Sequence, residues 1–371
     1  MSMVEWKKLG EVCGIFDGTH QTPKYTDSGI KFVSVENIND LYNSNKYISE
    51  EDYNANYKTK PQRNDVLMTR IGDVGSCAIV DHDEPLAYYV SLALLRPAPN
   101  VISGYIKYIL GSHIGKVELR KRTLLTAVPL KINLGDVGKV CIPIPSLSEQ
   151  QRIVGILDTF TSSIENLKEQ IAQRCKQYEY YRDQLLDLEG KPGVEMKKVA
   201  YFVKERILAN ELTAQNYTSV ENLLKDKAGR KDAETVPSEG NWIRYQKGDV
   251  LIGNIRPYLR KIWLSDREGG TNGDVIVIRS NDTLFPEFIF YCLASDSFFL
   301  YYNQALKDGK MPRGEKKRVL SYVIPSVGKE EQSRIVSILD TFEACIRNLE
   351  EQLAQRQKQY EYYRNKLLTF E

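Results

Sequence analysis

The sequence predicts an α/β (α+β) fold in two pseudo-symmetric copies, separated by an antiparallel two-helix coiled coil. Three observations support this prediction. One segment occurs twice at a constant offset, its apolar residues recur about every 3.5 residues, and the β-rich segments before each copy resemble each other more weakly. The order along the chain is therefore globule, helix, globule, helix.

The composition is that of a folded protein with two or three domains. The chain has 371 residues, 42% of them apolar and 27% charged, and its net charge is +2. A nucleic-acid-binding surface must then be a local basic patch. The six cysteines are widely spaced and form no metal-ligand pattern, so we expect reduced thiols and no metal site. No apolar run has the length of a membrane span and the first residues do not resemble a signal peptide, so we expect a cytoplasmic protein.

The globular segments mix β-rich and helical runs, and they repeat. EWKKLGEV at residues 5–12 resembles EMKKVAYF at 195–202, and DVLMTRI at 65–71 resembles DVLIGNI at 249–255. We predict two domains of the same type, at residues 1–145 and 190–326.

The strongest repeat predicts two long helices. Residues 152–188 align without gaps with residues 334–370, and 25 of the 37 positions are identical. Apolar residues alternate in steps of four and three, which places them on one helix face. We predict helices over 146–189 and 327–371. The predicted seam comprises Ile153, Leu157, Phe160, Ile164, Leu167, Ile171, Tyr178 and Leu185, then Ile335, Leu339, Phe342, Ile346, Leu349, Leu353, Tyr360 and Leu367.

The ends of the first helix also carry local signals. Ser148 and Gln151 have the spacing of a capping box, and Gly190 with Pro192 marks the stop. The second helix must run back along the first if the seams are to bury each other, which makes the pair antiparallel. About 36 residues of helix rise roughly 54 Å.

Each seam is interrupted by one arginine, Arg174 or Arg356. Two interpretations remain open. The aliphatic stem lies along the seam with its charge in water, or the polar residue fixes the register.

The tyrosines of the repeat divide into two groups. Those that follow the seam pattern favour packing within the coiled coil over stacking on bases. Tyr180 and Tyr362 fall just off the seam and are candidates for contact with a partner protein. The tyrosines on the pattern are Tyr178, Tyr181, Tyr360 and Tyr363.

The segments IPIPSLSEQQRIVGILD at 142–158 and IPSVGKEEQSRIVSILD at 324–340 carry a family resemblance. They look like the starts of the two central helices in DNA specificity subunits of type I restriction–modification systems. GTHQTPKYTDSGIKFVSVENI at 18–38 resembles one of that family's recognition-domain types. The resemblance covers essentially the whole chain in the family's order, with a two-residue insertion before the second helix.

The resemblance implies a non-catalytic subunit of a DNA restriction system. Each target recognition domain would read one half of an asymmetric, interrupted site in double-stranded DNA. The central helices would set the gap and dock methylation subunits, two by expectation, and restriction subunits would join. Those partners would bind the cofactors, namely S-adenosylmethionine for DNA methylation at adenine and ATP and Mg for cleavage. This chain would bind no cofactor.

Several loops carry residue types that contact DNA. Lys and Arg neutralise phosphates, and Arg, Lys, Asn, Gln, Ser and Thr discriminate bases. The richest basic stretch is KMPRGEKKR at 310–318, and its first-half counterpart is 116–131. A solvated charge run or a plain turn is the alternative at each loop. The predicted DNA-binding residues are Thr19, His20, Gln21, Thr22, Lys24, Arg70, Arg120, Lys121, Arg122, Lys131, Arg256, Tyr258, Arg260, Lys261, Lys310, Arg313, Lys316, Lys317 and Arg318. The lone His82 and His113 favour structural or solvated roles.

Two other function classes fit less well. A stand-alone adenine methyltransferase needs a glycine-rich cofactor loop and an N-P-P-aromatic motif, and neither occurs here. A scaffold that never touches DNA leaves the diverged globules and the basic loop without a role. The half-site bases and the gap length do not follow from the sequence, because recognition also depends on loop geometry and DNA shape.

Overall fold

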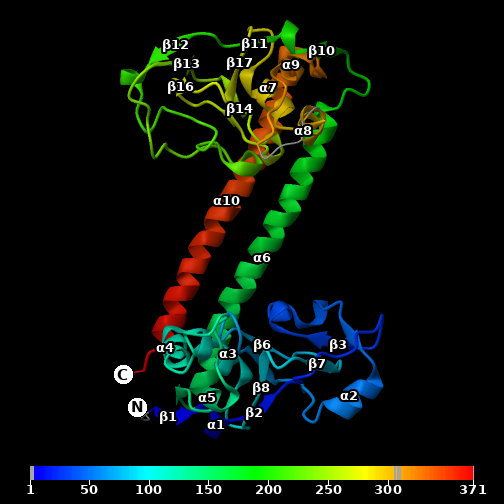
Figure 1. Cartoon of the computed structure of the whole chain (residues 1–371), viewed down its shortest axis with the longest axis vertical. Helices are drawn as coiled ribbons and strands as arrows, with labels where there is room; N and C mark the ends of the chain where they lie inside the picture. The colour runs from blue at the N-terminus through cyan, green and yellow to red at the C-terminus, as the bar shows by residue number, and fades with distance from the viewer. Residues whose placement is uncertain (1–3, 305, 307–310, 371) are drawn as a thin grey trace. The chain divides into compact units, whose positions relative to one another are not determined.

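The computed structural model describes residues 4–304, 306 and 311–370. Its contacts divide the chain into two compact units, unit 1 with residues 1–168 and 351–371 and unit 2 with residues 169–350. Each unit holds part of helix α6 (Leu147–Leu186) and part of helix α10 (Lys329–Leu367) (Figure 1). We call the part of unit 1 before α6 lobe 1, and the part of unit 2 between α6 and α10 lobe 2. None of the described helices is long and apolar enough to cross a membrane.

Lobe 1 contains three small sheets with short helices around them. A four-stranded antiparallel sheet has the order β2-β8-β5-β6, a three-stranded sheet has the order β4-β3-β7, and β1 pairs with β9. Its strands are β1 Glu5–Lys8, β2 Cys13–Asp17, β3 Ile30–Val33, β4 Tyr47–Ile48, β5 Val66–Thr69, β6 Cys77–Ile79, β7 Leu86–Tyr88, β8 Leu92–Pro97 and β9 Cys141–Ile144. Its α-helices are α1 Leu9–Val12, α2 Glu50–Asn56, α3 Ser103–Gly111, α4 His113–Arg120 and α5 Leu134–Val137.

Lobe 2 repeats this plan. Its four-stranded antiparallel sheet has the order β11-β17-β14-β15, its three-stranded sheet has the order β12-β13-β16, and β10 pairs with β18. Its strands are β10 Gly193–Glu195, β11 Ala200–Phe202, β12 Arg206–Leu208, β13 Asn241–Tyr245, β14 Val250–Gly253, β15 Ile262–Leu264, β16 Gly269–Thr271, β17 Val275–Ser280 and β18 Val323–Pro325. Its α-helices are α7 Pro286–Leu293, α8 Asp296–Asn303 and α9 Lys316–Ser321.

The repeated DVL motif forms the central strand of each four-stranded sheet. Every residue of β5 and of β14 is buried, so both faces of these strands are covered. Val66 packs in the core that includes α3 and the start of α6, whereas Leu67 packs on the opposite side. Such continuous apolar runs are typical of strands buried on two faces.

A buried glutamine joins each long helix to its lobe. The side-chain carbonyl of Gln150 accepts a hydrogen bond from the Ile102 amide at 3.0 Å, and its amide donates to Pro145 O at 3.0 Å. Gln332 repeats both bonds, with the Phe285 amide at 2.8 Å and Val327 O at 2.8 Å. The two-residue insertion before α10 therefore leaves this junction unchanged.

A second bond reinforces each junction about two turns further along the helix. The Tyr108 hydroxyl donates to Asp158 at 2.5 Å in unit 1, and the Tyr291 hydroxyl donates to Asp340 at 2.6 Å in unit 2. Because these aspartates belong to the repeated ILDTF segment, its polar residue has the same structural role in both copies.

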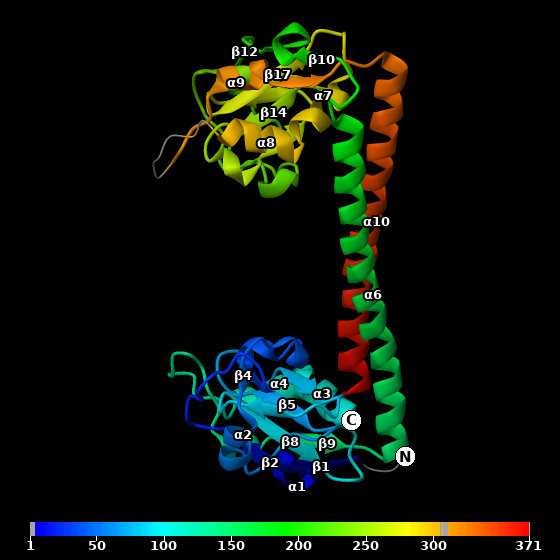
Figure 2. The same ribbon diagram turned by 90° about the vertical axis from the view of Figure 1, so that its right-hand side faces the viewer.

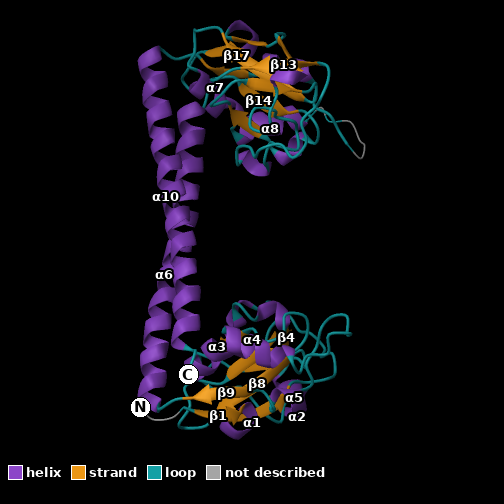
Figure 3. Cartoon of the chain, turned by 90° about the vertical axis from the view of Figure 1, so that its left-hand side faces the viewer, coloured by secondary structure: helices purple, strands orange, loops and turns teal. Residues whose placement is uncertain are grey.

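Helices α6 and α10 form the predicted antiparallel pair, in which they run side by side (Figures 2 and 3). In unit 1 Phe160 stacks on Tyr363, with ring centroids 5.3 Å apart. In unit 2 Phe342 lies 6.3 Å from the ring of Tyr178 and 5.6 Å from that of Tyr181. All sixteen predicted seam residues are buried or half-buried.

The seam arginines follow the first of the two interpretations. Both Arg174 and Arg356 are half-buried. The guanidinium of Arg356 lies 5.8 Å from the ring centre of Phe160, and Arg174 donates to the Gln177 side chain at 2.9 Å. Their stems therefore cover the seam while their charged ends reach its edge.

The predicted capping box of the first helix is wrong. Ser148 lies inside α6, and the hydroxyl of Ser146 accepts the Glu149 amide at 3.4 Å instead. The helix begins at Leu147, two residues earlier than that motif suggests, because Ser146 and not Ser148 accepts the hydrogen bond at the helix start. At its other end α6 stops at Leu186, so Leu188 lies beyond the helix.

Unit 2 buries one carboxyl group in the coiled coil. Glu343 accepts a hydrogen bond from the Tyr178 hydroxyl at 2.9 Å. Burial raises the pKa of Glu343 and the charge of Asp340 adds to this, while Tyr178, Arg347 and Tyr291 oppose it. Unit 1 has an uncharged residue, Thr161, at the equivalent repeat position.

We predict that Glu343→Gln raises the thermal unfolding midpoint at neutral pH. A carboxyl whose pKa is raised in the folded state loses stability as the pH rises above the unfolded value of about 4.3. The midpoint difference between variant and wild type should therefore grow from pH 5 to pH 8, measured by calorimetry. Glu351→Gln, at an exposed position of the same helix, is the control. A variant less stable than wild type at pH 8 would contradict the prediction.

Candidate nucleic-acid interface

Each lobe brings two loops together at the end of its central strand. In lobe 1 the Gly72 amide donates to Leu130 O at 2.8 Å, and the Ile132 amide donates to Arg70 O at 2.9 Å. Ile71 and Lys131 are bridge partners. The turn after β5 and the loop before α5 are thus fixed to each other.

Lobe 2 has the same arrangement. The Arg256 amide donates to Pro312 O at 2.8 Å and the Gly314 amide donates to Asn254 O at 3.1 Å, with Ile255 and Arg313 as bridge partners. Lys131 in lobe 1 and Arg313 in lobe 2 therefore occupy equivalent places. We call these two paired loops the bridge loops, residues 70–75 with 121–132 in lobe 1 and residues 254–261 with 311–318 in lobe 2.

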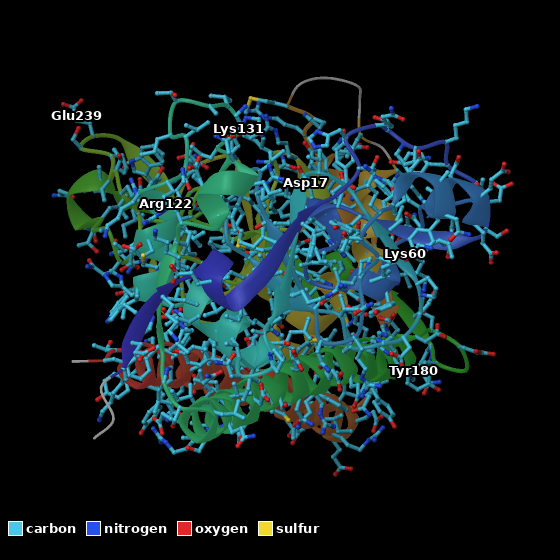
Figure 4. All side chains as sticks on the ribbon, turned by 90° about the horizontal axis from the view of Figure 1, so that it is seen from below. Asp17, Lys60, Arg122, Lys131, Tyr180 and Glu239 are labelled. Carbon is cyan, nitrogen blue, oxygen red and sulfur yellow. The ribbon has the colours of Figure 1, made fainter. Side chains whose placement is uncertain are left out.

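The lobe 1 bridge loops present part of the predicted basic set. Lys131 is exposed, and so is Arg120, the last residue of α4 directly before the loop. Lys121 and Arg122 form ion pairs with Glu118, at 2.6 and 2.8 Å. Although burial opposes it, the hydrogen bond from Lys121 helps to lower the pKa of Glu118. Figure 4 shows Arg122 and Lys131 on the side of lobe 1 that lies away from the helices.

Arg70 has a different environment from the exposed cations. Its guanidinium pairs with Asp17, and its side chain is only 11% exposed. Asp17 also pairs with the exposed His20 at 2.9 Å. This contact ties the end of β2 to the end of β5, and it gives Arg70 a structural role. A DNA contact by Arg70 remains a prediction.

The remaining lobe 1 candidates lie in the loop after β2. Thr19 forms a bridge with Tyr89, which fixes the start of this loop. Its exposed members line a polar cleft of about 210 Å³ together with Asn56 and Tyr57. The exposed candidates are Gln21, Thr22 and Lys24.

The RPYLR turn of lobe 2 has an unusual backbone. Arg256 and Arg260 both have φ 50°, in the left-handed region, on either side of a short turn at 257–259. A residue with a side chain is held there at a cost of about 1 kcal/mol or more, so such conformations cluster at functional sites. Arg256 and Tyr258 are exposed, the latter by 50%. Arg256 and Lys261 line a cleft of about 510 Å³.

The basic stretch at residues 310–318 contains both exposed side chains and side chains that point into the lobe. Arg313 is 63% exposed and pairs with Asp274 at 2.8 Å, and Lys316 donates to Gly273 O at 2.8 Å. Lys317 is also exposed. Arg318 turns inward, with its guanidinium 4.1 Å from the ring centre of Tyr301. Lys310 lies outside the described residues.

Two lobe 2 candidates are engaged in structural contacts. Arg260 pairs with Asp226 at 3.2 Å and with Asp296 at 3.0 Å. Lys261 donates to Val220 O at 2.6 Å, and burial lowers its pKa. Both remain predictions as DNA contacts.

Asp296 gathers three cations at the end of α6. It pairs with Lys227 at 2.9 Å, with Arg260 at 3.0 Å and with Arg182 at 3.3 Å. Arg182, from the first QYEYYR hexapeptide, is fully buried. Burial opposes ionisation of Asp296, but the hydrogen bond and charge of Lys227, followed by the charge of Arg182, lower its pKa to about 2. The sequence pattern did not reveal this cluster because its members are far apart along the chain.

Asp296→Asn should destabilise unit 2. Removing one partner of a buried cation leaves its charge uncompensated. Because Asp296 is 46% exposed, we expect a loss of only about 1–2 kcal/mol and a midpoint lower by a few degrees. The difference should vanish as the pH falls from about 4 towards 2, where the carboxylate of the wild type is protonated. Asp183→Asn, which leaves Asp296 in place, should cost less in the same calorimetric measurement.

The expected absence of a metal centre and the two lone histidines can be compared with the described part of the chain. No group of three or more His, Cys, Asp or Glu among the described residues is placed to hold a metal ion. His82 lies 4.4 Å from the ring of Tyr42, and His113 is exposed at the start of α4.

Comparison with known proteins agrees with this architecture. The type I restriction modification DNA specificity domain matches residues 1–176 and 200–356. The EcoR124I/EcoR124II specificity subunit of Escherichia coli is 27% identical over 260 residues, 62% of this chain and 63% of that relative. This match spans less than two thirds of its length. A type I specificity subunit assigned in Haemophilus influenzae is 26% identical over 421 aligned positions, 100% of this chain and 96% of the relative.

Solved structures show the same fold. The S subunit of a type I restriction–modification system from M. genitalium has a TM-score of 0.62 at 14% identity, covering 100% of this chain and 98% of that one. A chain solved to explain complex assembly and conformational transition of the type I R-M system has a TM-score of 0.59 at 17% identity, covering 99% and 98%. The family match over both repeats, together with this fold, supports one conclusion: the chain belongs to the family of type I restriction–modification DNA specificity subunits.

Proposed function

We propose that this chain is a non-catalytic subunit whose two lobes each read one half of an asymmetric, bipartite site in double-stranded DNA. The observation that carries this proposal is the pair of equivalent bridge loops. Both place an exposed cation at the same bridge position, Lys131 in one lobe and Arg313 in the other. A repeated cation on a repeated frame suits the phosphates, which are the constant part of a duplex.

The second part of the proposal, that the half-sites differ, rests on the three-stranded sheets. In lobe 1 β3 pairs with β7 in parallel, whereas in lobe 2 β13 pairs with β16 antiparallel. The four-stranded sheets keep the same order in both lobes. Lobes that share a frame and differ in the inserted sheet are suited to different base sequences.

We infer that α6 and α10 set the gap between the half-sites. Each is one continuous helix, of 40 and 39 residues, that contributes to both units. A change in the length of both helices would then change the gap and leave the reading loops unaltered.

The helices also present a repeated surface for partner subunits. Tyr180 and Tyr362 occupy equivalent positions and are 58% and 59% exposed. Each packs edge-on against the tyrosine that follows it. We propose that these positions receive two copies of a methylation subunit. That subunit and the restriction subunits would supply S-adenosylmethionine, ATP and Mg chemistry, and this chain would hold no cofactor.

DNA binding by the assembled complex should weaken steeply with salt, because phosphate contacts release counterions. Arg313→Ala combined with Lys316→Ala should weaken binding and reduce the slope of log affinity against log salt by about 1–2. Lys197→Ala with Arg334→Ala removes the same charge from exposed ion-paired residues and is the control. Equal slopes for all three complexes in a fluorescence anisotropy titration would reject the bridge loop as a phosphate contact.

Deleting residues 164–170 from α6 and 346–352 from α10 removes one heptad from each seam. The helices should shorten by about 10 Å, which corresponds to about three base pairs. Mapping methylated adenines in DNA modified by the complex should show the same half-sites at a shorter gap. Altered half-sites with an unchanged gap would show that the helices do not measure the distance.

A further inference from the structure

The longer bridge loop of lobe 1 has an apolar tip that no feature described above explains. Residues 123–130 carry no charge. Val128 is 99% exposed and Leu125 is 55% exposed, and Leu124 and Leu130 are 39% and 41% exposed. A cluster of exposed aliphatic side chains in a soluble lobe marks a contact surface.

The backbone holds this tip in place. The Leu124 amide donates to Lys131 O at 2.8 Å and the Ala127 amide donates to Leu124 O at 3.3 Å. The Leu130 carbonyl is bonded to the Gly72 amide. The tip is therefore formed in advance, and little conformational entropy is lost when it binds.

The charge around the tip indicates what it meets. Four cations lie at the base of the tip. Lys121 and Arg122 are ion-paired with Glu118, and Arg120 and Lys131 are exposed. The tip directly precedes Lys131, the bridge residue whose equivalent in lobe 2 is Arg313. An apolar tip beside cations suits a ligand that is negatively charged outside and apolar inside. Duplex DNA is such a ligand, because its phosphates lie outside and its stacked bases lie inside.

We propose that the Leu125–Val128 tip is an apolar wedge that packs against the bases of the half-site read by lobe 1. This inference rests on the proposed function. Leucine and proline side chains inserted from a loop loosen the stacking of a base step. Pro129 beside Val128 extends this apolar edge, and it is exposed as well.

The test compares two double variants in the assembled complex. Leu125→Ser with Val128→Ser should weaken specific binding about 10- to 100-fold, because two buried aliphatic contacts are lost. Its salt slope should equal that of wild type, since no cation is removed. Leu300→Ser with Val323→Ser, at 69% and 39% exposed positions of lobe 2 outside the three-stranded sheet, is the matched control and should bind as wild type does.

A second readout locates the contact. The fluorescent base 2-aminopurine is placed in turn at each position of the half-site read by lobe 1, except the methylated adenine. Because its fluorescence increases when stacking is loosened, the wild-type complex should raise the signal at one base step. The Leu125→Ser, Val128→Ser complex should not. The wedge would be overturned if the Leu125→Ser, Val128→Ser complex bound DNA as tightly as wild type. It would also be overturned if this variant lowered the salt slope as much as Arg313→Ala with Lys316→Ala does, or if no position gave increased fluorescence with the wild-type complex. Loss of co-purifying methylation subunits would also overturn it, because the tip would then be a protein contact. A wild-type complex without salt-dependent DNA binding would instead reject the proposed function itself.

Discussion

The structure depends on apolar side chains that belong to two cores at once. Ile153 and Leu157 begin the helical seam and also lie in the core of lobe 1, and Ile335 and Leu339 do the same in lobe 2. Tyr360 of the opposite helix packs against the first core. Because the seam and the lobe core are continuous, each helix start is fixed by packing, and the buried glutamine then satisfies the backbone groups that this packing removes from water.

Local patterns were enough to predict the two long helices and the β-rich character of the lobes. The seam is read from a 3.5-residue period, whereas the segments of β5 and β14 are recognised as a repeat within β-rich runs and their burial on both faces emerges only from the structure. The DNA-contacting residues are harder to predict, because the type of a charged residue does not reveal whether its side chain points into the protein or toward solvent. Arg70, Arg318 and Lys131 look alike in sequence, yet Arg70 is paired with Asp17, Arg318 lies on Tyr301 and Lys131 is exposed. Each of the two inward partners lies at least seventeen residues away, beyond the reach of any local pattern.

The two copies of the hexapeptide show how identical segments acquire different environments. Arg182 is buried beside Asp183 and Asp296. Its repeat equivalent Arg364 lies 5.2 Å from the ring centre of Tyr360, and its Nε is buried without a hydrogen-bond partner among the described residues. The acids of unit 2 are replaced by Asn365 and His113 in unit 1. Lobe 2 is thus tied to α6 by an ion pair, whereas in unit 1 the His113 amide of lobe 1 donates a hydrogen bond to Asn365 of α10 at 3.4 Å.

The difference between the parallel and antiparallel three-stranded sheets has an evolutionary consequence. In each lobe two strands of the three-stranded sheet lie in the segment that leaves the four-stranded sheet after β2 or β11 and returns at β5 or β14. The third strand, β7 or β16, comes later in the chain. The strands before and after this segment flank the same neighbour, β8 or β17, so exit and return are separated by one strand. Such a segment is a cassette. If it is exchanged as one block of genetic material, the incoming block must still pair with β7 or β16, which stay in the frame.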